Sequence, residues 1–396
     1  MKKTEERICF CCGRHENEVP YLMEGNYGYI CSDCIDLGYK FVTEKANEKV
    51  NNNLMQGIPK PREIKDFLDQ YIIGQDRVKE RVAVAVYNHY KRISAPIIND
   101  VEIEKSNALI LGPTGSGKTL IARTIAKMLD VPFTIADATS ITESGYVGDD
   151  VESVITALYQ ASDYDVEKTE RGIVFLDEID KIARKGDNAS ITRDVSGEGV
   201  QQGLLKLLEG SIVSIPPKGG RKHPDIPLVK INTKNILFIC GGAFVGIEKI
   251  VASRCNKKVM GFVSQTNYNK KDEEYMDKIN PIDLKSFGLI PEIIGRLPII
   301  TYTDELDKEA MLRILKEPKN SLVKQYKRIF ELDNIKLEYT DEALEYIVDK
   351  TIEYKLGARG LRGTMETVMT KAMFNMPSED IKELTIDLDY VKKYLE

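Results

Sequence analysis

The feature that most constrains the fold of this chain is the octapeptide GPTGSGKT at Gly112–Thr119. It matches the phosphate-binding pattern G-x-x-x-x-G-K-[ST], with the apolar run NALIL before it and the helix-like LIARTIAKML after it. Glycines let the backbone N–H groups of such a loop turn toward phosphate oxygens, and the following helix adds the positive end of its dipole. The pattern predicts a strand–loop–helix unit that binds a nucleotide.

The side chains at the end of this loop predict how the nucleotide is held. We expect Lys118 to reach the β- and γ-phosphates and Thr119 to ligate Mg²⁺. The residues expected to contact the nucleotide are Gly112, Pro113, Thr114, Gly115, Ser116, Gly117, Lys118, Thr119 and Leu120.

A second motif, GIVFLDEID at Gly172–Asp180, supplies the acids that complete such a site. Acids at the end of a buried strand are costly unless they have a role. Asp177 is expected to hold the Mg²⁺ shell opposite Thr119, and Glu178 to orient and activate the attacking water as a base. The two motifs together predict hydrolysis of ATP rather than binding alone.

Short apolar runs alternate with helical patterns through the middle of the chain. The strand candidates are residues 107–111, 131–136, 172–176 and 235–240, and helices are expected at 149–161 and 199–208. This alternation is typical of a parallel sheet covered by helices on both faces. Beyond Thr303 the pattern is mostly helical, with one strand candidate at 384–388, and predicts a smaller separate domain. The predicted fold class is therefore α/β.

Five of the seven cysteines fall near the N-terminus, at Cys9, Cys11, Cys12, Cys31 and Cys34. The pairs Cys9–Cys12 and Cys31–Cys34 each have C-x-x-C spacing, and about 18 residues separate them, as in four-cysteine zinc sites. Four thiolates close the tetrahedron, so the Zn²⁺ is expected to be structural. Cys11 competes with Cys12 for one position, although Gly13 favours Cys12 because a knuckle commonly needs such a residue after its second ligand.

Length and composition predict several domains in the cytosol. The 396 residues suggest a zinc module (1–42), a polar linker (43–61), a large domain (62–302) and a small domain (303–396). No apolar run approaches the roughly 20 residues that span a bilayer, and no apolar stretch follows the N-terminal lysines, so the chain is expected to be cytoplasmic. The net charge of −6 argues against a chain-wide nucleic-acid footprint.

The order of more specific strings resembles the ClpX family of AAA+ unfoldases. These strings are the zinc module, GPTGSGKT, GYVGDD, FLDEID, ITRDVSGEGVQQ, RKHP, GRLP and GARGLR. The resemblance covers nearly the whole chain. It implies an AAA+ domain with a mostly helical lid domain, assembled as a homo-hexameric ring that threads proteins through a central pore.

The same resemblance implies substrate and partner contacts. Tyr146 and Val147 match the gripping pair of the pore loop. An aromatic beside an aliphatic side chain can hold many sequences by burial alone. The second pore loop matches Ser190–Gln201 and includes Arg193, and the basic loop at the pore entrance matches Arg221, Lys222 and His223. The peptidase-docking loop matches Met260, Gly261 and Phe262, where Met replaces the usual aliphatic residue but can still enter an apolar cleft.

Two arginines and one apolar segment complete the implied nucleotide site. Arg296 matches the arginine that reaches the γ-phosphate of a neighbouring subunit, and Arg359 the arginine of the lid domain that senses nucleotide in its own subunit. Ile72 and Ile73 match the wall that packs on adenine. The implied function is ATP-dependent unfolding of tagged or adaptor-delivered proteins for a ClpP-type peptidase, with ATP, Mg²⁺ and Zn²⁺ as cofactors.

Two other functions stay open at this stage. One is a nucleic-acid-remodelling ATPase whose zinc module grips DNA or RNA, since zinc knuckles do bind nucleic acids. The acidic composition of the module speaks against it: Glu5, Glu6, Glu16, Glu18, Glu24, Asp33 and Asp36. The other is a non-hydrolysing scaffold, against which the intact Lys118, Asp177 and Glu178 speak.

Overall fold

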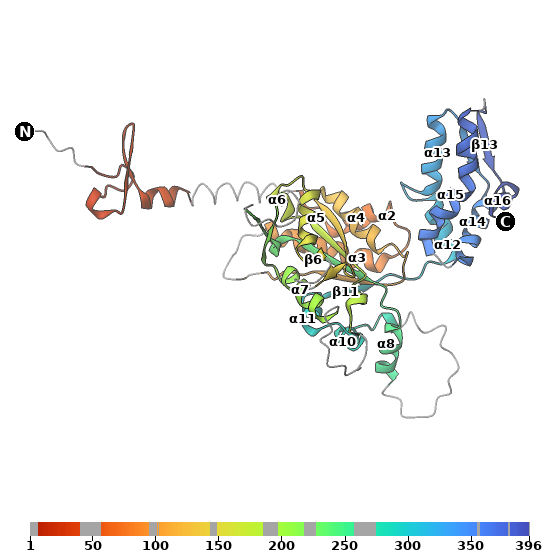
Figure 1. The fold of residues 1–396 in the computed structure, drawn as a ribbon, viewed down its shortest axis with the longest axis horizontal. Helices are drawn as coiled ribbons and strands as arrows, with labels where there is room; N and C mark the ends of the chain where they lie inside the picture. The colour runs from red at the N-terminus through yellow and green to blue at the C-terminus, as the bar shows by residue number, and fades with distance from the viewer. Residues whose placement is uncertain are drawn as a thin grey trace, which may run out of the picture. The chain divides into compact units, whose positions relative to one another are not determined.

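The computed structural model of the chain (Figure 1) describes residues 7–39, 57–94, 101, 103–142, 149–184, 197–217, 227–256, 275–354, 357–378 and 381–395. The chain divides into two compact units. One comprises residues 1–58 with 91–101, and the other comprises residues 59–90 with 102–396.

The N-terminal unit contains a small hairpin. Strands β1 (Leu22–Gly25) and β2 (Gly28–Cys31) pair in antiparallel fashion, after a short 3₁₀ helix, η1 (Glu16–Glu18). A helix follows at 32–39. Within residues 7–39, Cys9 and Cys31 are the only buried side chains. So little burial cannot hold a fold together, and segments of this size need a metal or another staple.

The second unit is built on a five-stranded parallel sheet of order β11-β3-β10-β7-β4, which confirms the predicted α/β class. Every residue of β3 and β10 is buried. Because side chains alternate between the two faces of a strand, this burial means that both faces are covered. The strands are β3 (Ala108–Leu111), β4 (Phe133–Asp137), β7 (Ile173–Asp177), β10 (Leu237–Gly242) and β11 (Ile299–Tyr302).

Helices pack on this sheet and fill its large apolar core. Helix α4 contacts β7 and β10, and α5 contacts β4. Asp149–Asp150 forms a short strand, β6, paired with β5 (Ile141–Thr142), so the helix expected from residue 149 starts only at Ser153. The remaining short elements are η2 (Ile179–Ile182), β8 (Ile212–Ile215), β9 (Val229–Asn232) and η3 (Thr233–Asn235). The helices are α2 (Pro61–Asp69), α3 (Asp76–Ser94), α4 (Lys118–Leu129), α5 (Ser153–Ala161), α6 (Val166–Thr169), α7 (Glu198–Glu209), α8 (Ile247–Asn256), α10 (Pro281–Phe287) and α11 (Pro291–Gly295).

The C-terminal part has an apolar core of its own, which includes Met311, Tyr326, Leu344 and Met365. Two short parallel strands, β12 and β13, lie among its helices. Strand β13 ends at Ile386 because Leu388 already begins the last helix, two residues short of the predicted strand end. The elements are α12 (Lys308–Lys316), α13 (Leu322–Leu332), β12 (Lys336–Tyr339), α14 (Asp341–Glu353), α15 (Gly357–Asn375), η4 (Met376–Ser378), β13 (Glu383–Ile386) and α16 (Leu388–Leu395).

In the described ranges, no helix combines the length and apolarity that crossing a membrane requires. The predicted cytoplasmic location and the predicted domain limits stay predictions.

Candidate functional site

The phosphate-binding loop joins β3 to α4, as the motif predicts. Gly112 has φ of 137°, and a Cβ at this position would clash with Thr303. Gly117 has φ of 100° and precedes α4, and no side chain caps the helix there. The first N–H groups of α4 therefore face the loop without a side-chain acceptor, which is the arrangement that favours a phosphate group.

Lys118 is buried beneath the loop. Its ammonium group donates to the carbonyl oxygens of Gly112, at 2.6 Å, and Pro113, at 2.8 Å. Burial lowers the pKa of Lys118, the nearby Asp177 and Asp180 partly offset this effect, and Arg359 lowers the pKa further. A desolvated cation in the loop that lacks a fully compensating anion suits a negatively charged ligand.

Asp177 ends β7 beside the phosphate-binding loop. The hydroxyl of Thr119 donates to its carboxylate at 3.3 Å, so the two predicted Mg²⁺ ligands lie together. A hydroxyl and a carboxylate are the hard oxygen donors that Mg²⁺ prefers, and the pair fits the predicted ion.

Glu178 directly follows this strand in a strained conformation. Its side chain is exposed and its backbone is left-handed, with φ of 58°. Its N–H group donates to the carboxylate of Asp177 at 2.9 Å. Non-glycine residues in this region of φ/ψ space gather at functional sites, which accords with the predicted role of Glu178 as the base.

Two buried polar residues position this site and were not predicted. Asp180 accepts a hydrogen bond from the N–H group of Ala243, at 3.1 Å, which ties the acidic motif to the end of β10. Asn107 donates to the carbonyl oxygen of Arg296, at 2.9 Å, and accepts from the N–H group of Phe238. The third acid of the string DEID was the only sequence signal for Asp180, and Asn107 had none.

The two predicted arginines lie in different surroundings. Arg296 follows α11, and its guanidinium group donates to Glu209 of the same chain at 3.0 and 3.2 Å. Arg359 is exposed on α15, close enough to Lys118 to affect its pKa. Gly357, where α15 begins, lies beside Thr114, because a Cβ there would come within 3.1 Å of the Thr114 carbonyl oxygen.

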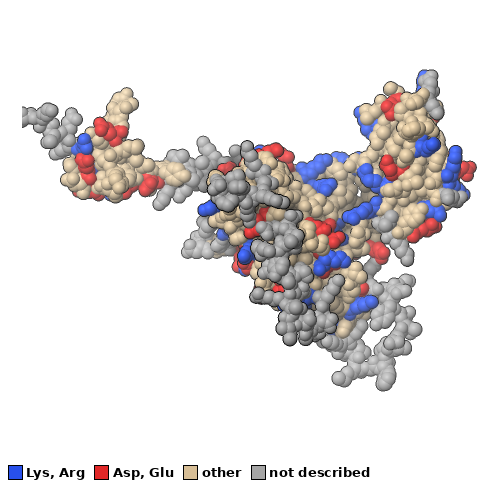
Figure 2. Space-filling view, in the orientation of Figure 1, with Lys and Arg blue, Asp and Glu red and all other residues tan. Residues whose placement is uncertain are grey.

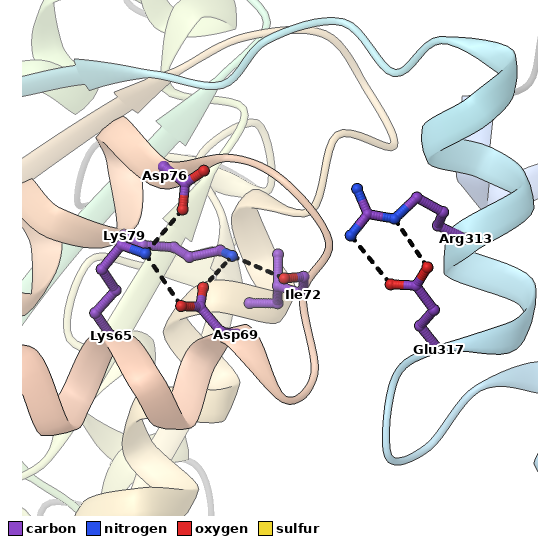
Figure 3. A network of polar contacts seen from close by, with 7 residues as sticks. All are labelled: Lys65, Asp69, Ile72, Asp76, Lys79, Arg313 and Glu317. Atoms are coloured by element: carbon purple, nitrogen blue, oxygen red, sulfur yellow. Dashed lines mark hydrogen bonds and ion pairs between the residues drawn. The ribbon is translucent and has the colours of Figure 1, made fainter.

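Ile72 and Ile73 lie in the segment between α2 and α3, and both are buried. Lys79 holds this segment in place: its ammonium group donates to the Ile72 carbonyl oxygen at 2.8 Å and to Asp69 at 2.5 Å (Figure 3). Figure 3 also shows Lys65 between Asp69 and Asp76, and the separate pair of Arg313, on α12, with Glu317, the residue that follows this helix. Polar contacts within the chain therefore hold this segment against α2 and α3.

The structure brings together the four predicted zinc ligands. Four sulfur atoms lie within 4.8 Å of one another, those of Cys9, Cys12, Cys31 and Cys34. Cys11 is exposed and is not part of this sulfur group. Backbone N–H groups, first that of Cys12, lower the pKa of Cys9 to about 6 although burial opposes them. Side-chain hydrogen bonding, first with Cys31, raises the pKa of Cys34. Four converging sulfurs fit a tetrahedral Zn²⁺ ion.

Three family models match this chain. Residues 7–44 match the ClpX C4-type zinc finger, residues 103–300 the AAA domain of the Cdc48 subfamily, and residues 306–385 the C-terminal, D2-small domain of ClpB protein. The "ATP-dependent Clp protease ATP-binding subunit ClpX" of Bacteroides fragilis is 58% identical over 401 residues, which cover 100% of this chain and 97% of the relative.

The chain belongs to the ClpX family. The proteins of the same name from Bacteroides thetaiotaomicron and Porphyromonas gingivalis are 58% and 55% identical over 404 and 400 residues, again covering 100% of this chain and 97% of each relative. Membership of the ClpX family confirms the predicted fold class, the AAA ATPase class and the four-cysteine zinc finger.

Several contacts that the ClpX resemblance implies lie outside the described residues. These are the pore-loop, entrance-loop and docking-loop residues Tyr146, Val147, Arg193, Arg221, Lys222, His223, Met260, Gly261 and Phe262. Leu120 is exposed at the start of α4. Cys240 is buried in β10, and burial raises its pKa to about 12, so its thiol stays protonated and chemically quiet.

Proposed function

We propose that this ClpX-family chain is an ATP-driven unfoldase that unfolds protein substrates and passes them to a ClpP-type peptidase. The observation that carries the proposal is the combination of an ATPase site with the ClpX zinc finger in one chain, at 58% identity to a Clp protease subunit across the full length. The proximity of Lys118, Thr119 and Asp177 supports hydrolysis as the source of energy.

In the proposed reaction each residue of the site has one task. Lys118 exchanges its contacts with the loop carbonyls for phosphate oxygens, and the N-terminus of α4 binds the same group. Thr119 and Asp177 would hold Mg²⁺, which supplies charge stabilisation at the phosphates. Glu178 takes a proton from the attacking water, and Arg359 contacts the nucleotide from the C-terminal domain.

Arg296 acts in a neighbouring subunit in this proposal. It would leave Glu209 and contact the γ-phosphate bound next door, which makes hydrolysis depend on assembly of a homo-hexamer. Ring assembly would place Tyr146 and Val147 in a central pore. Typical domains are stable by only about 5–15 kcal/mol. Repeated movements of the loop that carries Tyr146 and Val147 can therefore unfold a substrate domain.

Other parts of the chain would serve delivery. Met260, Gly261 and Phe262 would dock the peptidase, and Arg193, Arg221, Lys222 and His223 would contact the substrate in and above the pore. The zinc module, within the proposed limits 1–42, would receive substrates or adaptors.

The test is degradation of a tagged, stably folded fluorescent protein in the presence of ATP, with and without a ClpP-type peptidase. We expect fluorescence to fall only when ATP and peptidase are both present. The Tyr146→Ala variant is expected to degrade at least about tenfold less substrate for each ATP hydrolysed, because it lacks the aromatic side chain that contacts the substrate. The Tyr146→Phe variant keeps an aromatic side chain and should degrade as much substrate per ATP as the wild type. Persistent fluorescence with vigorous ATP hydrolysis would contradict the unfoldase and leave only the ATPase.

The alternative of a nucleic-acid-remodelling ATPase has less support. Both arginines of residues 7–39 are paired with carboxylates, Arg7 with Glu16 at 3.3 Å and Arg14 with Asp33 at 2.9 Å. Figure 2 shows acidic and basic side chains interspersed on the face that it presents, rather than a basic stripe. Salt-dependent binding of DNA by the zinc module would favour this alternative.

A further inference from the structure

Gln75 connects the segment after α2 to the stretch of chain that leaves the sheet. Its side-chain amide donates to the Asp304 carbonyl oxygen at 2.9 Å and accepts from the Asp304 N–H group at 2.9 Å. Asp304 lies between the end of β11 and the start of α12, so it belongs to the connection that leads to the C-terminal domain. One buried amide thus satisfies both backbone groups of a residue 229 positions away.

The backbone of Gln75 is strained to allow this contact. Its φ is 63°, in the left-handed region, although it has a long side chain and is 6% exposed. Such a conformation persists only where its surroundings enforce it, and it invites a functional explanation. Glycine would adopt this φ more easily, but it would lose both hydrogen bonds to Asp304.

The other side of the segment is anchored to the helices. Ile72 and Ile73, the expected contacts of adenine, come three and two residues before Gln75, and Lys79 fixes the carbonyl group of Ile72 (Figure 3). Lys79 is 2% exposed and pairs with Asp69, so this anchor is firm. A base that presses on Ile72 and Ile73 therefore acts on a short, held segment that ends at Gln75.

Thr303 makes a second link from the same connection. Its hydroxyl group lies 2.6 Å from that of Ser116 in the phosphate-binding loop, and its N–H group donates to the Leu111 carbonyl oxygen at 2.8 Å. Adjacent residues of the connection are thus bonded to both parts of the candidate nucleotide site: Thr303 to the phosphate side and Asp304 to the base side.

We propose that Gln75 is a positioning residue that transmits occupancy of the base-binding segment to the connection at Thr303–Asp307. The inference rests on the proposed binding of ATP at this site. When a base contacts Ile72 and Ile73, the Gln75–Asp304 pair holds the connection in one conformation. The Thr303–Ser116 contact reports on the phosphates in the same way, so the C-terminal domain receives both signals through two adjacent residues.

Hydrogen exchange followed by mass spectrometry tests the proposal on the full-length chain. Exchange of peptides covering Thr303–Asp307 is compared with and without saturating ATPγS, with bound nucleotide measured in the same samples. In the wild type, we expect ATPγS to slow exchange there by about tenfold, the size of effect that hydrogen bonds in a local opening give. Gln75→Gly should lose most of this difference, because it removes the pair while relieving the backbone strain.

Asp163→Gly is the matched control, since Asp163 is exposed, has φ of 55° and lies at the α5–α6 turn. It should keep the full response. Gln75→Glu should keep part of it, since its carboxylate still accepts from the Asp304 N–H group but no longer donates. Thr303→Val should lose part of the response, because valine has nearly the shape of threonine but lacks the hydroxyl group that contacts Ser116. This variant also tests the proposal if Gln75→Gly does not fold.

Three outcomes would overturn the proposal: a wild type that binds ATPγS without protection of this peptide, a Gln75→Gly variant that binds it with full protection, or an equal loss in Asp163→Gly. A wild type that fails to bind ATPγS would instead contradict the proposed function.

Discussion

Lys79 shows how a charged side chain is kept inside this domain. Its ammonium group has two partners, Asp69 and the Ile72 carbonyl oxygen. Burial raises the pKa of Asp69, but hydrogen bonds from Lys79 and then Lys65 outweigh it, and the pKa lies below its ordinary value. Removing one partner of such a pair costs more than the pair itself contributes, because the remaining charge stays buried.

We therefore expect Asp69→Asn to destabilise the α2–α3 junction by about 1–3 kcal/mol, less than for a fully buried pair because Asp69 is partly exposed. Exchange of the α3 amides would measure this loss.

The stabilisation by Asp69 should depend on pH. The pKa of Asp69 is depressed in the folded state. Its contribution to stability is therefore present above the pKa of the unfolded state and disappears as pH falls through the pKa of the folded state. The difference between variant and wild type should shrink below about pH 4. Lys79→Met, which removes the charge, should cost less than Asp69→Asn; the reverse order would contradict this account.

The residues of the nucleotide site divide by how they could be predicted. Lys118, Thr119 and Asp177 stand in short motifs whose chemistry is readable from spacing. Asp180, Asn107 and Gln75 were not assigned such roles because their partners are 63, 189 and 229 residues away. Only the fold brings a buried polar group to a distant backbone group, so no local pattern announces it.

At the scale of elements, apolar runs predicted four of the five strands of the main sheet to within about two residues. The edge strand β11 was missed because its four residues, IITY, follow directly on GRLP and carry no alternation of their own. It forms because it can pair with β3. The zinc module was predictable for a different reason, since C-x-x-C spacing sets local geometry.

We expect Cys31→Ser to abolish zinc binding by the N-terminal module and to raise exchange across residues 7–39 to near the unfolded rate, because no other core holds them. Zinc content by a colorimetric assay and exchange of the module peptides would measure both effects. Cys11→Ser is the matched control, because Cys11 is exposed and outside the sulfur group. Equal zinc loss in the two variants would contradict the ligand set, and exchange of α5 should change in neither.

At the scale of the whole molecule, the described chain has two large apolar cores, one around the sheet and one in the C-terminal part. The phosphate-binding loop and the acidic motif lie at the ends of strands that pack in the sheet core, whereas Arg359 is exposed on α15, a helix that packs in the second core. Arg296 contacts Glu209 of its own chain at the surface, where a neighbouring subunit could compete for it. Assembly could not be predicted from local patterns, and entered only through family resemblance.

Mixing two inactive variants tests whether Arg296 works across subunits. Glu178→Gln should lower hydrolysis by about 10²–10⁴-fold, and Arg296→Ala by about 10³-fold or more. Rings assembled from equal amounts of both should regain activity at roughly a quarter of their sites, where an intact Glu178 faces an intact Arg296 next door. Steady-state ATPase rates give the answer. A mixture as inactive as its components would mean that Arg296 acts within its own chain.

The near absence of buried side chains between residues 7 and 39 has a consequence for the living cell. A fold that depends on one bound ion is not stable without it, so the fraction of folded modules follows the concentration of that ion. By mass action, each tenfold fall in free Zn²⁺ would remove about 1.4 kcal/mol from the folded N-terminal module. The AAA domain would be unaffected. Zinc starvation would thus unfold the N-terminal module while the AAA domain continued to hydrolyse ATP.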